Sequence, residues 1–309
     1  MAKTQPKHPL PKEVMIESYN RWIADVRGLA KETRGKRTRL ADDFLSFLDS
    51  RCQSFADATP VDVDAFFAEN AKRWCRLSLS TVASGLRDFL SYAAQKHWCD
   101  RRLTLSVVAP RVYPQESLPY HAPWSKIVEM LRASAKDRTR RGRRAYAILM
   151  LLATYGVRSS EVVRLSLDDI DWRKETIFFT RSKGGRSQTL RLIPAVGEAI
   201  LRYIRHARHN ESGFRNLFLR ADAPYAAIRS GVVYATVRKA LEGVGAESAH
   251  LGPHCIRHSF ATHHVNSGRS LKEVSDMLGH RSLGSTAVYA KVDLVSLREV
   301  AEMDWEGVL

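Results

Sequence analysis

The chain has 309 residues, 44% of them hydrophobic, which is enough for about two domains with ordinary buried cores. Lys and Arg number 49 against 33 Asp and Glu, a formal net charge of +16, and this surplus makes a polyanion the expected partner. No long apolar run and no export leader are found, so we expect a cytoplasmic protein with no membrane partner.

The stretch from about Val14 to Arg102 has helical periodicity throughout and predicts a bundle of four or five helices. The residues before it are rich in Lys and Pro, which indicates a mobile arm over residues 1–12. Two apolar stripes carry this prediction: Tyr19, Trp22, Ile23 and Val26, then Leu40, Phe44, Phe47 and Leu48. A basic cluster able to follow a nucleic-acid backbone lies between the stripes and consists of Arg34, Lys36, Arg37 and Arg39.

The helical period fails between Leu103 and Trp124, where Pro110, Pro114 and Pro119 predict an extended connector. We place the domain boundary here, with a linker over residues 109–121. Arg111 makes the linker basic, so it could either help two basic domains close around a duplex or act as a plain spacer.

The second domain is predicted to open with helices around 127–131 and 145–152, followed by a break at Thr154, Tyr155 and Gly156. Arg158 comes next, with Ser159 or Ser160 able to cap a new helix and Glu161 in its first turn. An arginine at a helix start can bind an anion, or it can simply pair with Glu161. A second basic cluster precedes this motif and consists of Arg138, Arg140, Arg141, Arg143 and Arg144.

Two segments rich in β-forming residues, 176–180 and 188–193, are joined by Gly184-Gly185, which predicts a β-hairpin. Lys183 lies beside the tip, where an exposed lysine is ordinary, and Arg181 and Arg186 are expected phosphate contacts. Helices are predicted again around 196–204 and 228–241. The chain is therefore expected to be mainly α with a small β-hairpin or sheet, an α+β fold.

The segment from His254 to Val292 carries the strongest signal. Pro253 is suited to start a helix and Gly268 to end it, and on that helix His254 and Arg257 share a face. A second helix, 271–278, is closed by Gly279 and followed by His280, with Tyr289 nine residues later. A cation, two imidazoles and a phenol suit attack on a phosphodiester by the phenolic oxygen.

Gly156-x-Arg158-x-x-Glu161, then His254-x-x-Arg257, Leu278-Gly279-His280 and Tyr289 together resemble the motifs of the tyrosine recombinases, the phage-integrase family. The first motif departs slightly, because Tyr155 stands between Thr154 and Gly156. The resemblance extends from about residue 14 and is strong from Ala145 onward. It implies a C-shaped clamp around DNA, with these parts: an arm, 1–12; a helical core-binding (SAM-like) domain, 13–108; a linker, 109–121; a catalytic domain, 122–292; and a tail, 293–309.

The resemblance also implies roles for the residues. Tyr289 would attack the phosphorus and form a 3′-phosphotyrosyl link. Arg158 and Arg257 would bind the non-bridging oxygens, and His280 would donate to one of them. Lys183 would protonate the leaving 5′ oxygen, with Arg186 the weaker candidate because a guanidinium hardly releases a proton. His254 would accept or relay the phenolic proton.

By the same resemblance, the partner is double-stranded DNA with inverted-repeat recombination sites, bound by a homotetramer that exchanges strands through a Holliday junction. No metal, ATP or other cofactor is expected. The tail has apolar residues at helical spacing, and in the family it docks on a neighbouring protomer; packing on its own domain is the alternative. The predicted DNA contacts are Arg34, Lys36, Arg37, Arg39, Arg111, Arg140, Arg141, Arg143, Arg181 and Arg186.

Three other functions are weighed. A type IB topoisomerase uses similar chemistry, and a non-catalytic DNA-binding regulator would explain the charge but not the Tyr and His spacing. A zinc hydrolase could use His254 and His258, four residues apart, but no HExxH or CxxC accompanies them. Cys52, Cys75, Cys99 and Cys255 are scattered and are interpreted as reduced thiols.

Overall fold

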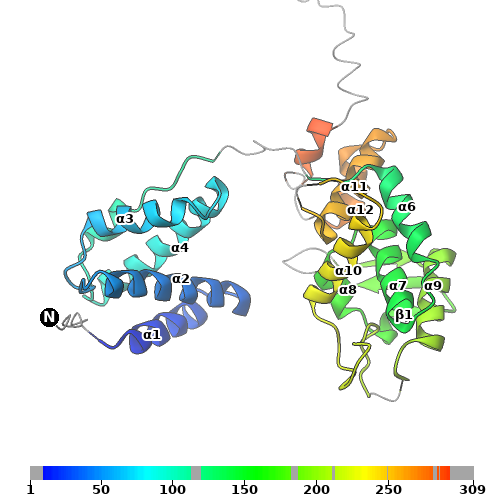
Figure 1. Cartoon of the computed structure of the whole chain (residues 1–309), viewed down its shortest axis with the longest axis horizontal. Coiled ribbons are helices and arrows are strands. Elements are labelled where there is room, and N and C mark those ends of the chain that lie inside the picture. Colours follow the sequence, from blue (N-terminus) through cyan, green and yellow to red (C-terminus); the bar gives the residue numbers. More distant parts are fainter. Residues whose placement is uncertain are drawn as a thin grey trace, which may run out of the picture. The chain divides into compact units, whose positions relative to one another are not determined.

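The chain divides into two compact units, residues 1–116 and 117–309 (Figure 1). The division falls inside the stretch 109–121 that the prolines mark as a connector. The computed structural model describes residues 10–112, 120–181, 187–210, 213–248, 250–280, 284 and 286–292. Most of the predicted arm, the centre of the linker, the hairpin tip and the whole tail 293–309 lie outside the described residues.

The N-terminal unit is a helical bundle, as predicted from its periodicity. Its helices are α1 (Lys12–Asp25), α2 (Lys31–Ser50), α3 (Pro60–Ala71), α4 (Arg76–Gln95) and the short α5 (Arg102–Ser106). Aromatic rings fill the centre: Phe44 meets Phe66 edge to face at 5.2 Å, and Phe55 stacks on Phe89 at 5.6 Å. Val26, expected on the first apolar stripe, is 68% exposed because α1 ends one residue before it.

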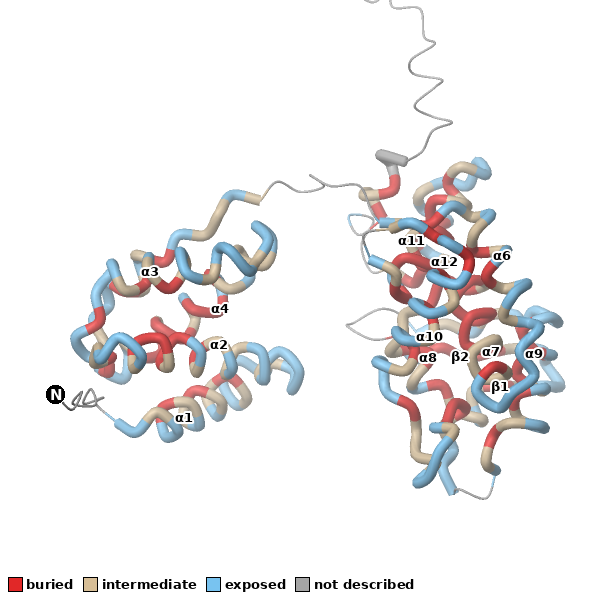
Figure 2. The backbone as a smooth tube through the Cα atoms, viewed as in Figure 1, coloured by how far each residue is buried: buried red, intermediate tan, exposed pale blue. Residues whose placement is uncertain are grey.

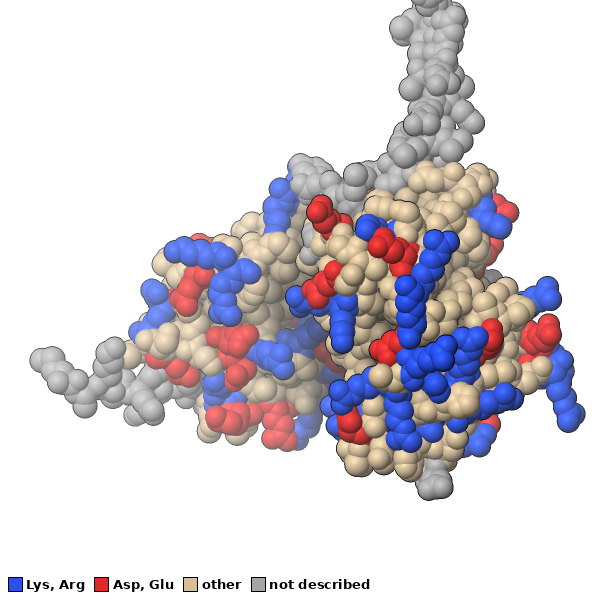
Figure 3. Space-filling view, turned by 45° about the vertical axis from the view of Figure 1, so that its right-hand side comes forward, with Lys and Arg blue, Asp and Glu red and all other residues tan. Residues whose placement is uncertain are grey.

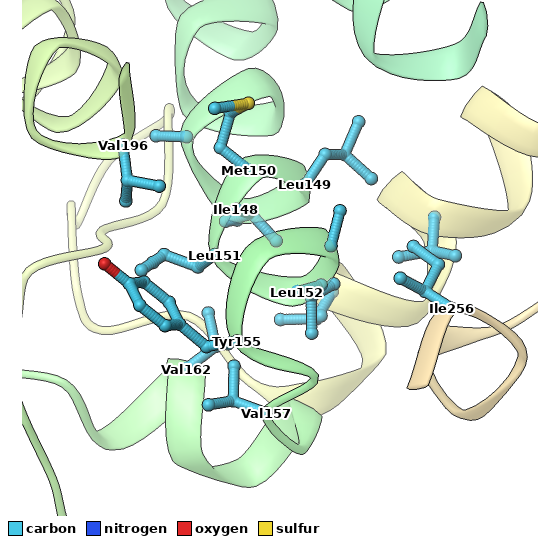
Figure 4. Close-up of a cluster of buried hydrophobic side chains, with 14 of the residues drawn as sticks. Ile148, Leu149, Met150, Leu151, Leu152, Tyr155, Val157, Val162, Val196 and Ile256 are labelled. Atoms are coloured by element: carbon cyan, nitrogen blue, oxygen red, sulfur yellow. The ribbon is translucent and has the colours of Figure 1, made fainter. Parts of the chain in front are cut away.

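The C-terminal unit is built around one buried helix, α7 (Arg140–Tyr155), whose residues 147–153 are all buried (Figure 4). Around it pack α6 (Trp124–Ser134), α8 (Ser159–Arg164), α9 (Pro194–His206), α10 (Ser230–Glu242) and α11 (Pro253–Asn266). Further helical elements in the described part of this unit include η1 (Leu167–Asp169), α12 (Leu271–Leu278) and the 3₁₀ helix η4 (Ala287–Val292). Figure 2 shows the buried residues of each unit on the inward faces of its helices.

A small antiparallel sheet completes this unit, so the prediction of a mainly helical α+β fold is confirmed. The order is β1 (Ile170–Asp171), β2 (Thr176–Phe179) and β3 (Gln188–Arg191), with Ile177 opposite Leu190. Ile177 and Phe179 are buried and Phe178 is exposed, which is the alternation expected of a strand with one covered face. The strands therefore lead into and out of the tip, 182–186, from a fixed base.

The end of α7 differs from the sequence prediction. The helix continues through Thr154 and Tyr155 and is closed only by Gly156, whose φ of +57° is left-handed. The Tyr155 side chain is anchored to the segment after β3, since its hydroxyl accepts a hydrogen bond from the Ile193 N–H and donates one to the Arg191 carbonyl. A Cβ on residue 156 would lie 2.7 Å from the Phe260 ring. Glycine is therefore required here both for the left-handed backbone and for lack of space.

The predicted boundaries of α11 and α12 are confirmed. Pro253 is the first residue of α11, and Gly268 follows its end with a φ of +81°. Ser270 caps α12 together with Glu273, and Gly279 closes it at a φ of +62°. None of the helices in the described part of the chain is long and apolar enough to cross a membrane.

Candidate active site

Arg158 stands at the start of α8, as the sequence predicts, but the cap differs from the prediction. Arg158 itself is the N-cap residue and Ser159 already belongs to the helix. The Glu161 carboxylate reaches back to accept the Arg158 backbone N–H at 2.9 Å and its Nη1 at 3.1 Å. The Arg158 side chain keeps 23% of its surface exposed, so this guanidinium remains within reach of a ligand.

Arg181 corrects one prediction, because its side chain is inaccessible to solvent and cannot contact a DNA phosphate in this arrangement. Its Nη1 donates to Glu161 at 2.7 Å, and its Nη2 donates to Gln188 and to the Met277 carbonyl. Gly279 permits this position, since a Cβ there would lie 2.7 Å from the Arg181 Nε. Arg181 therefore ties the base of the hairpin to α8 and α12.

Arg158, Glu161 and Arg181 form a buried ion cluster with Glu161 at its centre. The Glu161 side chain, like that of Arg181, is inaccessible to solvent. Burial acts to raise its pKa, but the hydrogen bond from the Arg158 N–H and the charge of Arg181 outweigh that effect. The net result is a pKa below the ordinary value, so Glu161 is a carboxylate at neutral pH.

Arg257 lies at the heart of the same region, on α11, and only 4% of the residue is exposed. Its Nη1 donates to the Gly156 carbonyl at 2.6 Å and its Nη2 to the Leu278 carbonyl at 3.1 Å. Burial, followed by the nearby charge of Arg158, lowers the pKa of Arg257 to about 10, so it still carries its charge at neutral pH. Arg257 thus places a fixed positive charge between the ends of α7 and α12.

His280 does not present a free donor, which corrects the role expected of it. Arg257 can only donate, so its Nη2 bond at 2.7 Å makes the His280 Nε2 an acceptor. Nδ1 then carries the proton and donates to the Thr286 hydroxyl, also at 2.7 Å. Burial and the neighbouring guanidiniums lower the pKa of His280 to about 4, in keeping with a neutral ring. His280 could donate to a phosphate only after its bond to Arg257 had broken.

Tyr289 lies on η4 with 2% of its surface exposed, and its phenol contacts an imidazole that the sequence analysis did not assign to this role. The Tyr289 oxygen lies 2.8 Å from Nδ1 of His258, on α11. His254 is exposed, in the first turn of the same helix, and its ring centroid lies 6.4 Å from that of His258. The hydrogen-bond partner of the phenol is therefore His258 and not the predicted His254.

A signal for His258 was present in the sequence. Residues four apart on a helix share a face, so His254 and His258 follow each other along α11, one turn apart. From the sequence alone, that pair is interpreted only as possible metal ligands. Within the described residues, no group of three or more His, Cys, Asp or Glu side chains is placed to hold a metal ion.

The predicted DNA contacts fall into different settings. Lys36, Arg39, Arg111, Arg140 and Arg141 are exposed, and Arg34 and Arg143 are half-buried. Arg37 is instead held inside the N-terminal unit by an ion pair with Asp88 at 3.1 Å, so its charge is already neutralised and the predicted contact is disfavoured. Lys183 and Arg186 lie outside the described residues. Figure 3 shows Lys and Arg side chains gathered on the visible face of the C-terminal unit.

Guanidiniums, imidazoles and a phenol gathered at the junction of α7, α11, α12 and η4 define a site for chemistry on a phosphodiester. Residues 125–294 match the phage integrase family. The protein y4rA of Sinorhizobium fredii, described as an integrase/recombinase, is 35% identical over 302 residues, covering 97% of this chain and 73% of that protein. The tyrosine recombinase XerC of Mesorhizobium japonicum is 27% identical over 294 residues, covering 93% of each chain.

Among solved structures, the XerH site-specific recombinase bound to difH in a pre-cleavage complex has the same fold, with a TM-score of 0.70 at 17% identity over 98% of this chain and 92% of that one. A lambda integrase tetramer bound to a Holliday junction gives a TM-score of 0.70 at 15% identity over 92% and 78%. The chain therefore belongs to the phage integrase family, the tyrosine recombinases, which are DNA strand-transferring enzymes.

Proposed function

We propose that this enzyme performs site-specific recombination by using Tyr289 as the nucleophile that cleaves and rejoins DNA strands. The phenolic oxygen attacks the scissile phosphorus, which gives a 3′-phosphotyrosyl link and a free 5′ hydroxyl. The observation that carries the proposal is the position of Tyr289, hydrogen-bonded to the helix that bears Arg257 and within electrostatic reach of Arg257 and Arg158. Both guanidiniums act to lower the pKa of the phenol, which means that they stabilise the phenolate.

Arg158, which is partly exposed, is proposed to bind a non-bridging oxygen of the scissile phosphate directly. Arg257 already donates to the Gly156 and Leu278 carbonyls, so it is proposed to bind a non-bridging oxygen by exchanging its bond to His280 for one to the phosphate. Two buried or half-buried guanidiniums supply fixed positive charge where the transition state gains negative charge, so we propose that neither a metal ion nor ATP is required. Exchange of a phosphodiester for a phosphotyrosyl ester retains the energy needed for resealing. A 5′ hydroxyl from a second strand can then complete strand transfer.

Lys183 is proposed as the acid that protonates the leaving 5′ oxygen. The support comes from its neighbours, because Arg181 and Gln188 on either side of the tip are hydrogen-bonded to backbone carbonyls of α12. Lys183 follows the anchored Arg181 by only two residues in the sequence. Arg186 is a weaker candidate because a guanidinium keeps its proton.

The DNA partner is proposed from the charge and from the relatives. The net charge of +16 and the exposed Lys36, Arg39, Arg111, Arg140 and Arg141 would follow the phosphate backbone. Both units would take part, with residues 13–108 and 122–292 each contacting the duplex and 109–121 as the connector. XerH is bound to difH in one solved structure, and lambda integrase forms a tetramer on a Holliday junction in another. We propose a homotetramer on inverted-repeat sites for this enzyme as well.

The experiment that tests this function is recovery of a covalent protein–DNA adduct. Wild-type protein is incubated with DNA from both ends of the genetic element that encodes it, the reaction is stopped with detergent, and the modified residue is mapped. We expect an adduct through Tyr289 that forms equally well in EDTA. Tyr289→Phe should bind the DNA nearly as well but form no adduct, since only the nucleophilic oxygen is missing. An adduct from the Phe variant, or a strict metal requirement, would refute the proposal.

A further inference from the structure

The phenol of Tyr289 and the imidazole of His258 are in contact at the edge of a small apolar cluster. The oxygen and Nδ1 are 2.8 Å apart, and the two rings are 5.6 Å apart at 55°. Tyr289 belongs to the same buried apolar cluster as Phe260, Val274 and Leu278. The charge of Arg257 acts on the His258 ring, so a proton held on that ring would lie within electrostatic reach of a residue proposed to bind the phosphate.

The phenol is the donor in this hydrogen bond. A phenolic O–H is a better donor than a neutral imidazole N–H, and an imidazole nitrogen is a better acceptor than a phenolic oxygen. Nδ1 is therefore the unprotonated nitrogen and faces the oxygen that would attack. This is the geometry required of a general base, within hydrogen-bond reach of the proton that it removes.

Tyr289 needs such a base. Burial raises the pKa of the phenol to about 12 in spite of the two guanidiniums, so very little phenolate is present at neutral pH. His258 is neutral and able to accept, because burial and then the charges of His254, Arg257 and His121 lower its pKa to about 4. These neighbours belong to α11 and to residue 121, and Tyr289 adds its hydrogen bond from η4. A bound phosphate would oppose their positive charge and would raise the basicity of the ring.

We propose that His258 accepts the phenolic proton when Tyr289 attacks the phosphodiester, an inference that rests on the function proposed above. The O–H bond of Tyr289 breaks and its proton passes to Nδ1. The phenolic oxygen forms a bond to phosphorus while the bond from phosphorus to the 5′ oxygen breaks, and that oxygen takes a proton from Lys183. On resealing, His258 returns its proton to the departing phenol.

The first test replaces His258 with glutamine, whose amide can still hydrogen-bond to the phenol but cannot take up a proton. We expect His258→Gln to lower the rate of adduct formation by about 10² to 10⁴-fold with DNA binding unchanged. His264→Gln is the matched control, since His264 lies on the same helix but packs on Phe260. Near-wild-type adduct formation by His258→Gln would overturn the inference, as would faster formation, which would make the contact a restraint on the phenol.

The second test separates proton transfer from a structural role. Tyr289 is replaced by 3,5-difluorotyrosine, a more acidic phenol that depends less on a base, in the wild-type protein, in His258→Gln and in Arg158→Ala. We expect the fluorinated residue to restore most of the rate lost in His258→Gln and little of that lost in Arg158→Ala. Equal rescue of both variants, or rescue of neither, would overturn the role of His258. Failure of the wild-type protein to form any adduct would instead refute the proposed function.

Discussion

Replacement of Glu161 by glutamine tests whether the buried ion cluster holds the active site together. The carboxylate accepts hydrogen bonds from the Arg158 N–H, from Arg158 Nη1 and from Arg181 Nη1, and the side chains of Glu161 and Arg181 are both 0% exposed. Glutamine has nearly the same shape but no charge. Arg181 would then be a buried guanidinium without a counter-ion, and the loss of one partner from a buried pair costs about 3–5 kcal/mol.

A loss of that size is measurable by thermal unfolding. For a domain of this size each kcal/mol lowers Tm by about 2–4 °C, so Glu161→Gln should melt roughly 6–20 °C below the wild type at pH 7. The control is Asp168→Asn, which breaks the Arg215–Asp168 pair, whose side chains are 68% and 63% exposed. That change should lower Tm only slightly, because an ion pair between solvent-exposed side chains contributes little to stability. If Glu161→Gln had the same Tm as the Asp168→Asn control, the buried ion cluster would not contribute the expected stability.

The pH dependence of the same comparison gives a second check. The pKa of Glu161 is lowered in the folded protein from an ordinary value of 4.5, so its stabilising effect is fully present above that pH. The effect is lost as the pH falls through the lowered pKa. The difference in stability between the wild type and Glu161→Gln should therefore be constant near neutrality and shrink below about pH 4.5. A difference that grew on acidification would contradict the lowered pKa.

Three further predictions concern catalysis and assembly. Arg158→Ala should leave Glu161 paired with Arg181, so Tm and DNA binding should change little. Single-turnover cleavage should fall at least about 10²-fold, because the positive charge at the phosphate is lost. A parallel fall in cleavage, Tm and DNA binding would make Arg158 a structural residue. Lys183→Ala should be rescued by sulfur in place of the bridging 5′ oxygen, because a thiolate leaves without protonation, and rescue of Arg186→Ala alone would move the role there. Deletion from Ser296 onward should preserve half-site binding but weaken synapsis and recombination on native gels, whereas wild-type synapsis would show that the tail packs within its own protomer.

Much of the fold follows from residues that lie close together in the sequence. The boundaries of α11 and α12 depend on Pro253, Ser270 and Gly279, whose backbone preferences and capping bonds act within one helical turn. The hairpin strands follow from β-forming residues on either side of a glycine pair. Arg158 at the start of α8 follows in the same way, since its backbone N–H bonds to Glu161 only three residues later.

The interactions of the charged groups could not be predicted in this way. Arg181 is a residue type that commonly contacts phosphate. In the folded protein it instead donates hydrogen bonds to Glu161, which is 20 residues away in the sequence, and to α12. The His280 ring could donate a hydrogen bond to a phosphate, yet both of its nitrogens are already hydrogen-bonded, to Arg257 and to Thr286. A side chain that can donate to DNA can equally donate to a buried carboxylate, and only long-range packing decides which partner is present.

By itself, the amino-acid sequence determined the helical pattern, the family and the set of residue types in the site, because motif spacing and helical periodicity are local properties of the chain. Only the tertiary structure decided that the phenol of Tyr289 contacts His258 rather than His254. One turn of α11 separates these two histidines, and the packing of η4 against α11 places the phenol against the second. That choice depends on the angle and depth at which two distant segments pack, which the spacing of residues along one helix does not encode.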